Sequence, residues 1–210
     1  MIENQSIDTT FRPRVLVVDD EKRIREGCET MLTEDGFFVV TAESGDLGLN
    51  MLTKEHYDII LLDLMMPGLS GFEVLEQIGA SHPDTIIIVI TGYATLEHAI
   101  EAMKKGAFDF IPKPFSPQEL RVVIKKAMDH IRTLHDIATE KSRMRALINH
   151  LPGGVMATDK DGTIALANPS FLRMIGCQTS DITGKPMNEI VVNDTLKELI
   201  REALTMPEDK

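Results

Sequence analysis

The sequence contains no tryptophan, two tyrosines and two cysteines, and aromatic residues make up only 5% of its 210 positions. Cys28 and Cys177 lie far apart and lack metal-site spacing, which argues against a disulfide framework or a cysteine-bound metal. No apolar run approaches the roughly 20 residues that a membrane-spanning helix requires. Residues 1–10 are polar and carry acidic side chains, which is not the pattern of a signal peptide. These absences favour a protein of the reducing cytoplasm with no membrane partner.

Positive charge is also in short supply. The chain has 22 Lys and Arg against 33 Asp and Glu, for a formal net charge of -11. This balance argues against nucleic acid or an anionic membrane surface as the main partner, because both are negatively charged. The hydrophobic share of 43% and the charged share of 26% are ordinary for a globular protein. The length suffices for one full domain and part of a second, or for two small ones.

Short apolar runs alternate with helical patterns along the first part of the chain. Ile59–Leu62 is apolar throughout and too short for a typical helix, which is typical of a strand buried on both faces of a parallel sheet. Strands alternating with helices predict an α/β fold with right-handed connections and helices on both faces. The expected strands are 14–18, 37–40, 59–62, 85–90 and 107–111, and the expected helices are 24–32, 47–52, 70–78 and 96–105.

Polar side chains stand where these strands end. Asp19 and Asp20 follow the first strand, Asp63 the third, Thr91 the fourth and Lys113 the fifth. Ligands of open α/β sheets bind outside the carboxyl ends of the strands, so we expect these side chains to converge at one edge. Three carboxylates in one cleft would repel one another and take up protons unless a cation neutralises them. Ligands that are all oxygen suit Mg²⁺, which can share its coordination shell with phosphate.

The hydroxyl and the ammonium point to phosphoryl transfer. Lys113 can offset the acids and hold a phosphoryl oxygen as a point charge, and Thr91 can donate a hydrogen bond to another. Phosphoryl transfer demands little beyond position and charge stabilisation, and an Asp63 nucleophile would form an acyl phosphate. The alternative is a structural network of ion pairs with a capping threonine, and the convergence of all these positions argues against it.

Four motifs occur in order over this part of the chain: Val17-Val18-Asp19-Asp20, Asp63-Leu64-Met65-Met66-Pro67-Gly68, Thr91-Gly92-Tyr93-Ala94 and Lys113-Pro114-Phe115. With these motifs, residues 14–130 resemble the receiver domain of two-component response regulators. The resemblance implies a flavodoxin-like, doubly wound sheet of five parallel strands in the order 2-1-3-4-5. It also implies that a partner histidine kinase or phosphotransfer protein phosphorylates Asp63. Such a protein catalyses its own phosphorylation but is not a conventional enzyme.

The same resemblance implies roles for the other residues. By similarity, Mg²⁺ would be bound by Asp19, Asp20, Asp63 and the backbone carbonyl of Met65, and the catalytic and switch residues would be Thr91, Lys113 and Phe110. The family often has Tyr where this chain has Phe110, and Phe keeps the packing but offers no phenolic hydrogen bond. The Lys113–Pro114 bond is a candidate cis peptide, as X-Pro bonds permit.

From Pro117 the pattern is that of one long helix, which ends at Leu151–Gly154. A seam with 3-4 spacing runs through Leu120, Ile124, Ala127, Ile131, Leu134 and Ala138, and a shifted phase continues through Ile137, Met144, Ile148 and Leu151. The fifth helix of a receiver should end near His130. We therefore expect a coiled-coil-like linker that pairs two chains in a homodimer. The alternative is a helix packed only on its own domain.

Residues 155–169 predict two short strands joined by an Asp161-Gly162 turn. Short helices are expected at 170–175 and 195–204. Together with Asn168-Pro169 and the run Asp181-Ile182-Thr183-Gly184-Lys185-Pro186, this part is similar to the first half of a PAS domain. The family's last three strands have no counterpart, so we expect a fragment of a longer protein and assign no cofactor to this half-domain.

The sequence thus predicts a phosphorylation-controlled signalling protein in four parts. They are a disordered N-terminus (1–12), a receiver domain (13–130), a helical linker (131–151) and the first part of a PAS-like domain (152–210). One rival is the front end of a hybrid sensor kinase or cyclic-dinucleotide enzyme. His135-Asp136 faintly resembles a kinase phosphoacceptor helix, but the usual Arg and Pro are absent and a solvated histidine is favoured. The other rival is a DNA-binding regulator, against which the acidic charge counts.

Overall fold

The computed structural model describes residues 12–92, 95–177, 182–191, 193, 195, 197–198 and 202. The chain divides into two compact units, Met1–Thr133 and Leu134–Lys210, and each is described by itself. Apart from Arg12, the N-terminus expected to be disordered lies outside the described residues, and so does most of the helix expected over 195–204. Among the described residues no helix is both long and apolar enough to cross a membrane.

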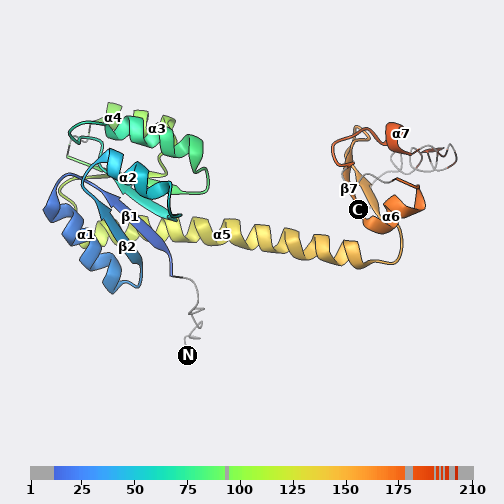
Figure 1. Ribbon diagram of the computed structural model, residues 1–210, viewed down its shortest axis with the longest axis horizontal. Helices are drawn as coiled ribbons and strands as arrows, with labels where there is room; N and C mark the ends of the chain where they lie inside the picture. Colours follow the sequence, from blue (N-terminus) through green and yellow to red (C-terminus); the bar gives the residue numbers. More distant parts are fainter. Residues whose placement is uncertain are drawn as a thin grey trace. The chain divides into compact units, whose positions relative to one another are not determined.

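The first unit is built on a parallel sheet of five strands in the order β2-β1-β3-β4-β5, as the resemblance implied. The strands are β1 (Arg14–Val18), β2 (Phe38–Ala42), β3 (Ile59–Leu62), β4 (Ile86–Thr91) and β5 (Asp109–Pro112). Every residue of β3 and β4 is buried, because helices cover both faces of the sheet (Figure 1). The expected strand 37–40 is longer at its carboxyl end, since Thr41 and Ala42 continue the pairing with β1.

Two hydrophobic cores lie on the two faces of this sheet. The helices are α1 (Lys22–Glu34), α2 (Gly45–Leu52), α3 (Gly71–Ser81), α4 (Leu96–Lys104) and α5 (Pro117–His150). Alternate strand residues such as Leu16 and Ile60 pack with α2, α3 and α4, whereas Val15 and Ile59 pack with α1 and α5. Ser70 does not begin α3 but caps it, in a reciprocal capping box with Glu73. Because all five strands are parallel, their carboxyl ends and the polar residues there lie at a common edge of the sheet.

The first half of α5 belongs to the receiver core. Leu120, Ile124 and Ala127, which the sequence analysis placed in a coiled-coil seam, are buried beside α1 and the sheet. The expectation that the seam starts at Leu120 is therefore wrong, because a receiver helix uses the same 3-4 spacing to pack on its own sheet. Leu134 and Ile137, further along the helix, are exposed.

The second unit contains the predicted hairpin and a small core. Its elements are the antiparallel strands β6 (Met156–Thr158) and β7 (Ile164–Ala167) and the helices α6 (Pro169–Met174) and α7 (Met187–Ile190). Gly162 has a φ of 79°, which suits the expected Asp-Gly turn. Ile164, Phe171 and Met187 are buried together. Helix α7 was not predicted from the sequence.

Two buried side chains, Asn168 and Ser170, connect the end of α5 to the elements that follow it, and Ser170 Oγ donates to Leu151 O at 2.9 Å. Asn168 Oδ1 accepts hydrogen bonds from the backbone N–H groups of Val155 and Phe171, at 2.9 and 2.8 Å. Its Nδ2 donates to the carbonyls of Ile148 and Gly153, at 3.0 and 2.9 Å. Asn168 therefore caps α6 and at the same time holds the last turn of α5.

Candidate functional site

Three carboxylates gather where β1 and β3 end, as predicted. Asp19 and Asp63 are buried and Asp20 is exposed. One oxygen from each residue lies within 4.8 Å of the others. They meet because β1 and β3 are adjacent parallel strands, and the backbone N–H of Asp63 continues the pairing by donating to Val18 O at 2.9 Å. Asp19, Asp20 and Asp63 are called the acidic cluster below.

Lys113 brings a positive charge into the acidic cluster. Its Nζ lies 2.7 Å from Asp63 Oδ2, 2.8 Å from Asp19 Oδ2 and 2.8 Å from Glu21 Oε1. The Lys113–Pro114 bond is cis, as predicted. The backbone N–H of Lys113 also donates to Thr91 O at 2.8 Å, which ties the lysine to the end of β4. One ammonium therefore bridges acids from two strands.

Burial and charge act in opposite directions on these groups. Burial raises the pKa of Asp19, and the neighbouring Lys113 ammonium opposes the rise. For Lys113, burial acts to lower the pKa, but its contacts with Asp19, Asp63 and Glu21 outweigh it and leave the pKa above its usual range. Lys113 therefore remains an ammonium over the physiological pH range.

The residues of the acidic cluster fit a divalent cation. Asp19 Oδ2 is buried and, although Lys113 Nζ lies nearby, has no well-aligned hydrogen-bond donor among the described residues. A buried oxygen in this condition is costly, and a metal ion would satisfy it. All the side-chain donors are carboxylate oxygens, which favours Mg²⁺ over softer metals. The Met65 N–H donates to Asp63 Oδ1 at 3.0 Å, so the residue whose carbonyl was predicted as a ligand adjoins the cluster.

Two residues of the site were missed by the sequence analysis. Glu21 forms an ion pair with Lys113. Arg25 donates hydrogen bonds from one guanidinium nitrogen to the backbone carbonyls of Asp19 and Asp20, at 2.7 and 2.9 Å. Arg25 holds the loop of the two acids against the start of α1. The available signal was a basic residue in the first turn of the helix that follows the acid pair.

Thr91 and Phe110, the predicted switch residues, lie on adjacent strands. Thr91 is buried at the end of β4. Phe110 lies on β5 opposite Val89, half-buried against the core that α2, α3 and α4 cover. The rest of the threonine motif, Tyr93 and Ala94, lies outside the described residues.

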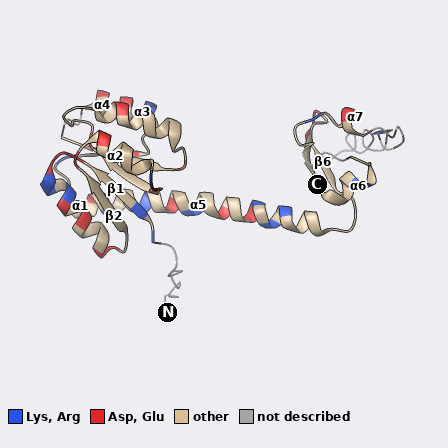
Figure 2. Cartoon of the chain, viewed as in Figure 1, with Lys and Arg blue, Asp and Glu red and all other residues tan. Residues whose placement is uncertain are grey.

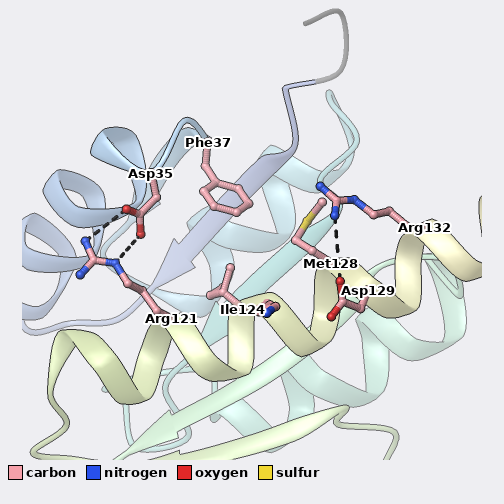
Figure 3. A pocket seen from close by; sticks show the side chains of 8 residues that line it. Asp35, Phe37, Arg121, Ile124, Met128, Asp129 and Arg132 are labelled. Atoms are coloured by element: carbon pink, nitrogen blue, oxygen red, sulfur yellow. Dashed lines mark hydrogen bonds and ion pairs between the residues drawn. The ribbon is translucent and has the colours of Figure 1, made fainter. Parts of the chain in front are cut away.

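A shallow pocket of about 230 Å³ lies between α5 and the turn before β2, and contains no predicted site residue (Figure 3). Arg121 forms a two-pronged pair with Asp35 there, at 2.7 and 3.1 Å. Arg132 faces Asp129 of its own helix at 4.0 Å. Both guanidinium groups are already paired with acids. We therefore interpret this pocket as part of the packing contact between α5 and the rest of the receiver, and not as a ligand site.

Comparison with known families agrees with the geometry. The model of the response regulator receiver domain matches residues 15–125, and the model of the PAS fold matches residues 142–209. Relatives include the probable transcriptional regulator ycf27 of Guillardia theta, 40% identical over 61% of this chain and 51% of its own length. The regulatory protein AtoC of Escherichia coli is 30% identical over 76% of this chain and 36% of its own.

Solved structures agree as well. A CheY-like receiver domain protein from Methanospirillum hungatei is 31% identical with a TM-score of 0.57, over 59% of this chain and 98% of its own. The chain spans about half or less of the length of the curated relatives just described.

Proposed function

This chain belongs to the response regulator receiver family, and from that membership we propose that Asp63 accepts a phosphoryl group from a partner histidine kinase or phosphotransfer protein. The observation that carries the proposal is the position of Lys113 Nζ, in contact with Asp63 and Asp19 at the carboxyl edge of the sheet. An Asp63 oxygen attacks the phosphorus, the bond from phosphorus to the donor nitrogen breaks, and an acyl phosphate forms. The Lys113 ammonium then holds a phosphoryl oxygen.

We assign the Mg²⁺ ligands to Asp19, Asp20, Asp63 and the Met65 carbonyl. When bound, the ion would neutralise charge that develops on the phosphoryl oxygens. Asp19 and Asp63 keep their carboxylates in place through the N–H groups of Glu21 and Met65, so the ligands are oriented before any donor arrives. This orientation favours transfer because little reorganisation remains.

The signal would leave the site through Thr91 and Phe110. A phosphoryl group on Asp63 offers an acceptor to the Thr91 hydroxyl, and a shift of Thr91 makes room for the Phe110 ring. Close-packed interiors respond to such a shift by changing between discrete arrangements. The start of α5, at Pro117, lies just beyond β5 and so is the element through which the change would reach the linker.

We propose for the parts the boundaries predicted from the sequence: receiver over 13–130, linker over 131–151 and PAS-like part from 152. We propose that the linker pairs two chains and carries the receiver's state to the PAS-like part. The exposed apolar residues of the linker and the Asn168 junction support this proposal.

The assignment of Asp63 is tested by incubating the protein with acetyl phosphate and Mg²⁺ and measuring intact mass. The wild type should gain one phosphoryl group, Asp63→Asn none, and removal of Mg²⁺ by a chelator should stop the gain. Asp84→Asn is the matched control, because this exposed acid precedes β4 and lies at the opposite edge of the sheet. Equal labelling of Asp63→Asn and the wild type would show that another residue is the acceptor.

A second candidate is regulation of transcription, which the name of the Guillardia theta relative favours. The acidic net charge of -11 means that this chain would need DNA-binding residues from elsewhere in a longer protein. The reading frame downstream of Lys210 discriminates: a DNA-binding domain supports this function, whereas a kinase or cyclic-dinucleotide domain supports an enzyme output.

A further inference from the structure

The second half of α5, together with Leu151 just after it, carries an apolar stripe with a repeat of seven residues. Its positions alternate in steps of three and four. They are Leu134, Ile137, Lys141, Met144, Ile148 and Leu151, called the linker stripe below. Leu134, Ile137, Met144 and Leu151 are exposed, at 53%, 60%, 58% and 46%, and Ile148 is half-buried. Five of the six positions are apolar, and Lys141 is the exception.

The linker stripe is not a continuation of the receiver-facing surface of α5. At about 100° per residue, the stripe is centred roughly a quarter turn from the face that Leu120, Ile124 and Ala127 present to the sheet. Packing of the receiver therefore leaves the stripe uncovered. Charged residues of both signs lie on the rest of the linker (Figure 2), and the exposed Leu147 is a large apolar residue that lies beside the stripe rather than on it.

We infer that the linker stripe is an interaction surface for a second copy of this chain, paired parallel and in register with Lys141 opposite Lys141. The inference deepens the proposed homodimer and rests on that part of the proposed function. In heptad terms Leu134, Lys141 and Ile148 are a positions, and Ile137 and Met144 are d positions. This spacing is the one at which two helices interlock side chains in a left-handed supercoil.

The charges beside the stripe identify the occupant and its direction. In a parallel pair, a residue at g faces the e residue five positions later on the partner, so Glu140 faces Arg145 of the other copy. Glu140 also flanks the position of the partner's Lys141. In an antiparallel pair over the same residues, Glu140 would face Leu147 and Arg145 would face Ala138. Only the parallel pairing places opposite charges together, so charge complementarity favours it.

Lys141 fixes the register. A slip of one heptad would set each lysine against Leu134 or Ile148, where the ammonium has no acid beside it and an apolar layer is lost. In register, both lysines share one layer, and each can extend toward the Glu140 carboxylate of the other copy. A lysine at a single a position is known to specify register at a cost in stability. Pairing over six layers, one of them polar, is therefore weak enough for the receiver to control.

Charge variants of the full chain test the occupant by analytical ultracentrifugation over a range of concentrations. Glu140→Lys should weaken dimerisation by about tenfold or more, because it adds a charge like those of Lys141 and Arg145 on the partner. The double variant Glu140→Lys with Arg145→Glu should recover most of the loss. Lys141→Leu should tighten the dimer by about tenfold or more, since it completes the apolar line. Arg143→Glu is the matched control on the outer face: it breaks only the contact with Glu140 of the same helix and should leave the dimer unchanged.

Direction and register are tested by oxidative cross-linking in a Cys177→Ser background. Met144→Cys should form a disulfide between copies, because its side chains face each other only in the parallel, in-register pair. Arg143→Cys should not. A chain that stays monomeric at every concentration, or equal cross-linking of the two variants, overturns the inference and means that another segment or another protein covers the stripe. Both measurements use unphosphorylated protein, so they can fail while Asp63 labelling succeeds, and the reverse.

Discussion

The closest packing at the candidate site predicts what one added methyl group would do. A Cβ at Gly71, the first residue of α3, would lie 2.2 Å from the carbonyl oxygen of Asp63 and 2.4 Å from Leu64 Cα. Carbon atoms in contact prefer about 3.5–4.0 Å, so strand and helix must separate by more than about 1 Å. Both atoms are backbone at the end of β3, which no side-chain rotation can move.

The expected cost follows from these contacts. Overpacking costs about 1–3 kcal/mol. Weakening the hydrogen bond from the Gly71 N–H to Leu64 O, which is 3.1 Å long, costs about 0.5–1.5 kcal/mol more. Gly71→Ala should therefore destabilise the receiver by about 1.5–4.5 kcal/mol. Gly79→Ala in the same helix is the control, because its nearest neighbour is Lys105 O at 3.8 Å and alanine favours a helix by about 0.5–1 kcal/mol. The two variants should differ by about 2–5.5 kcal/mol.

Urea unfolding followed by tyrosine fluorescence measures this difference. Both tyrosines, Tyr57 and Tyr93, lie in the first unit, so the signal reports the receiver alone. At a slope of about 2 kcal/mol per molar urea, the two midpoints should be roughly 2 M apart. Phosphorylation of Asp63 should also slow in Gly71→Ala under folding conditions, because the strand end that carries the acceptor has shifted. A midpoint for Gly71→Ala within about 0.3 M of the wild type would refute the reasoning.

Two further predictions concern the acid pair and the linker junction. Asp20→Asn should weaken Mg²⁺ binding in calorimetric titration more than Asp19→Asn, since the Lys113 ammonium 2.8 Å from Asp19 Oδ2 competes with a cation there, whereas the Asp20 carboxylate is exposed to a hydrated ion; the reverse order would contradict this ranking. Asn168→Ala should destabilise the second unit by about 3 kcal/mol, through loss of a helix cap and of buried hydrogen bonds, and speed hydrogen exchange there. Unchanged exchange in the second unit would show that the junction is held by other contacts.

The convergence of the acidic cluster with Lys113 could be predicted because it depends on topology alone. Each of these residues lies within two positions of the carboxyl end of a strand, and parallel strands place such residues at one edge whatever the details of packing. Glu21 and Arg25 could not be found in this way. Their contacts depend on where the first turn of α1 directs their side chains, and the local sequence permits many exposed acids and bases the same spacing.

The linker shows why periodicity alone assigns a helix face incompletely. A 3-4 repeat reports that one side of a helix is covered, and it does not say by what. Leu120 through Ala127 and Leu134 through Leu151 carry similar repeats, yet the first set is covered by the chain's own sheet and the second is exposed. What separates them in the sequence is the change of phase near Leu134, where the apolar line moves about a quarter turn around the helix. If one partner covered the whole helix, the apolar line would keep its phase. A change of phase is expected where the helix packs against two partners on different faces, so the phase change itself indicates that the linker stripe contacts a second surface.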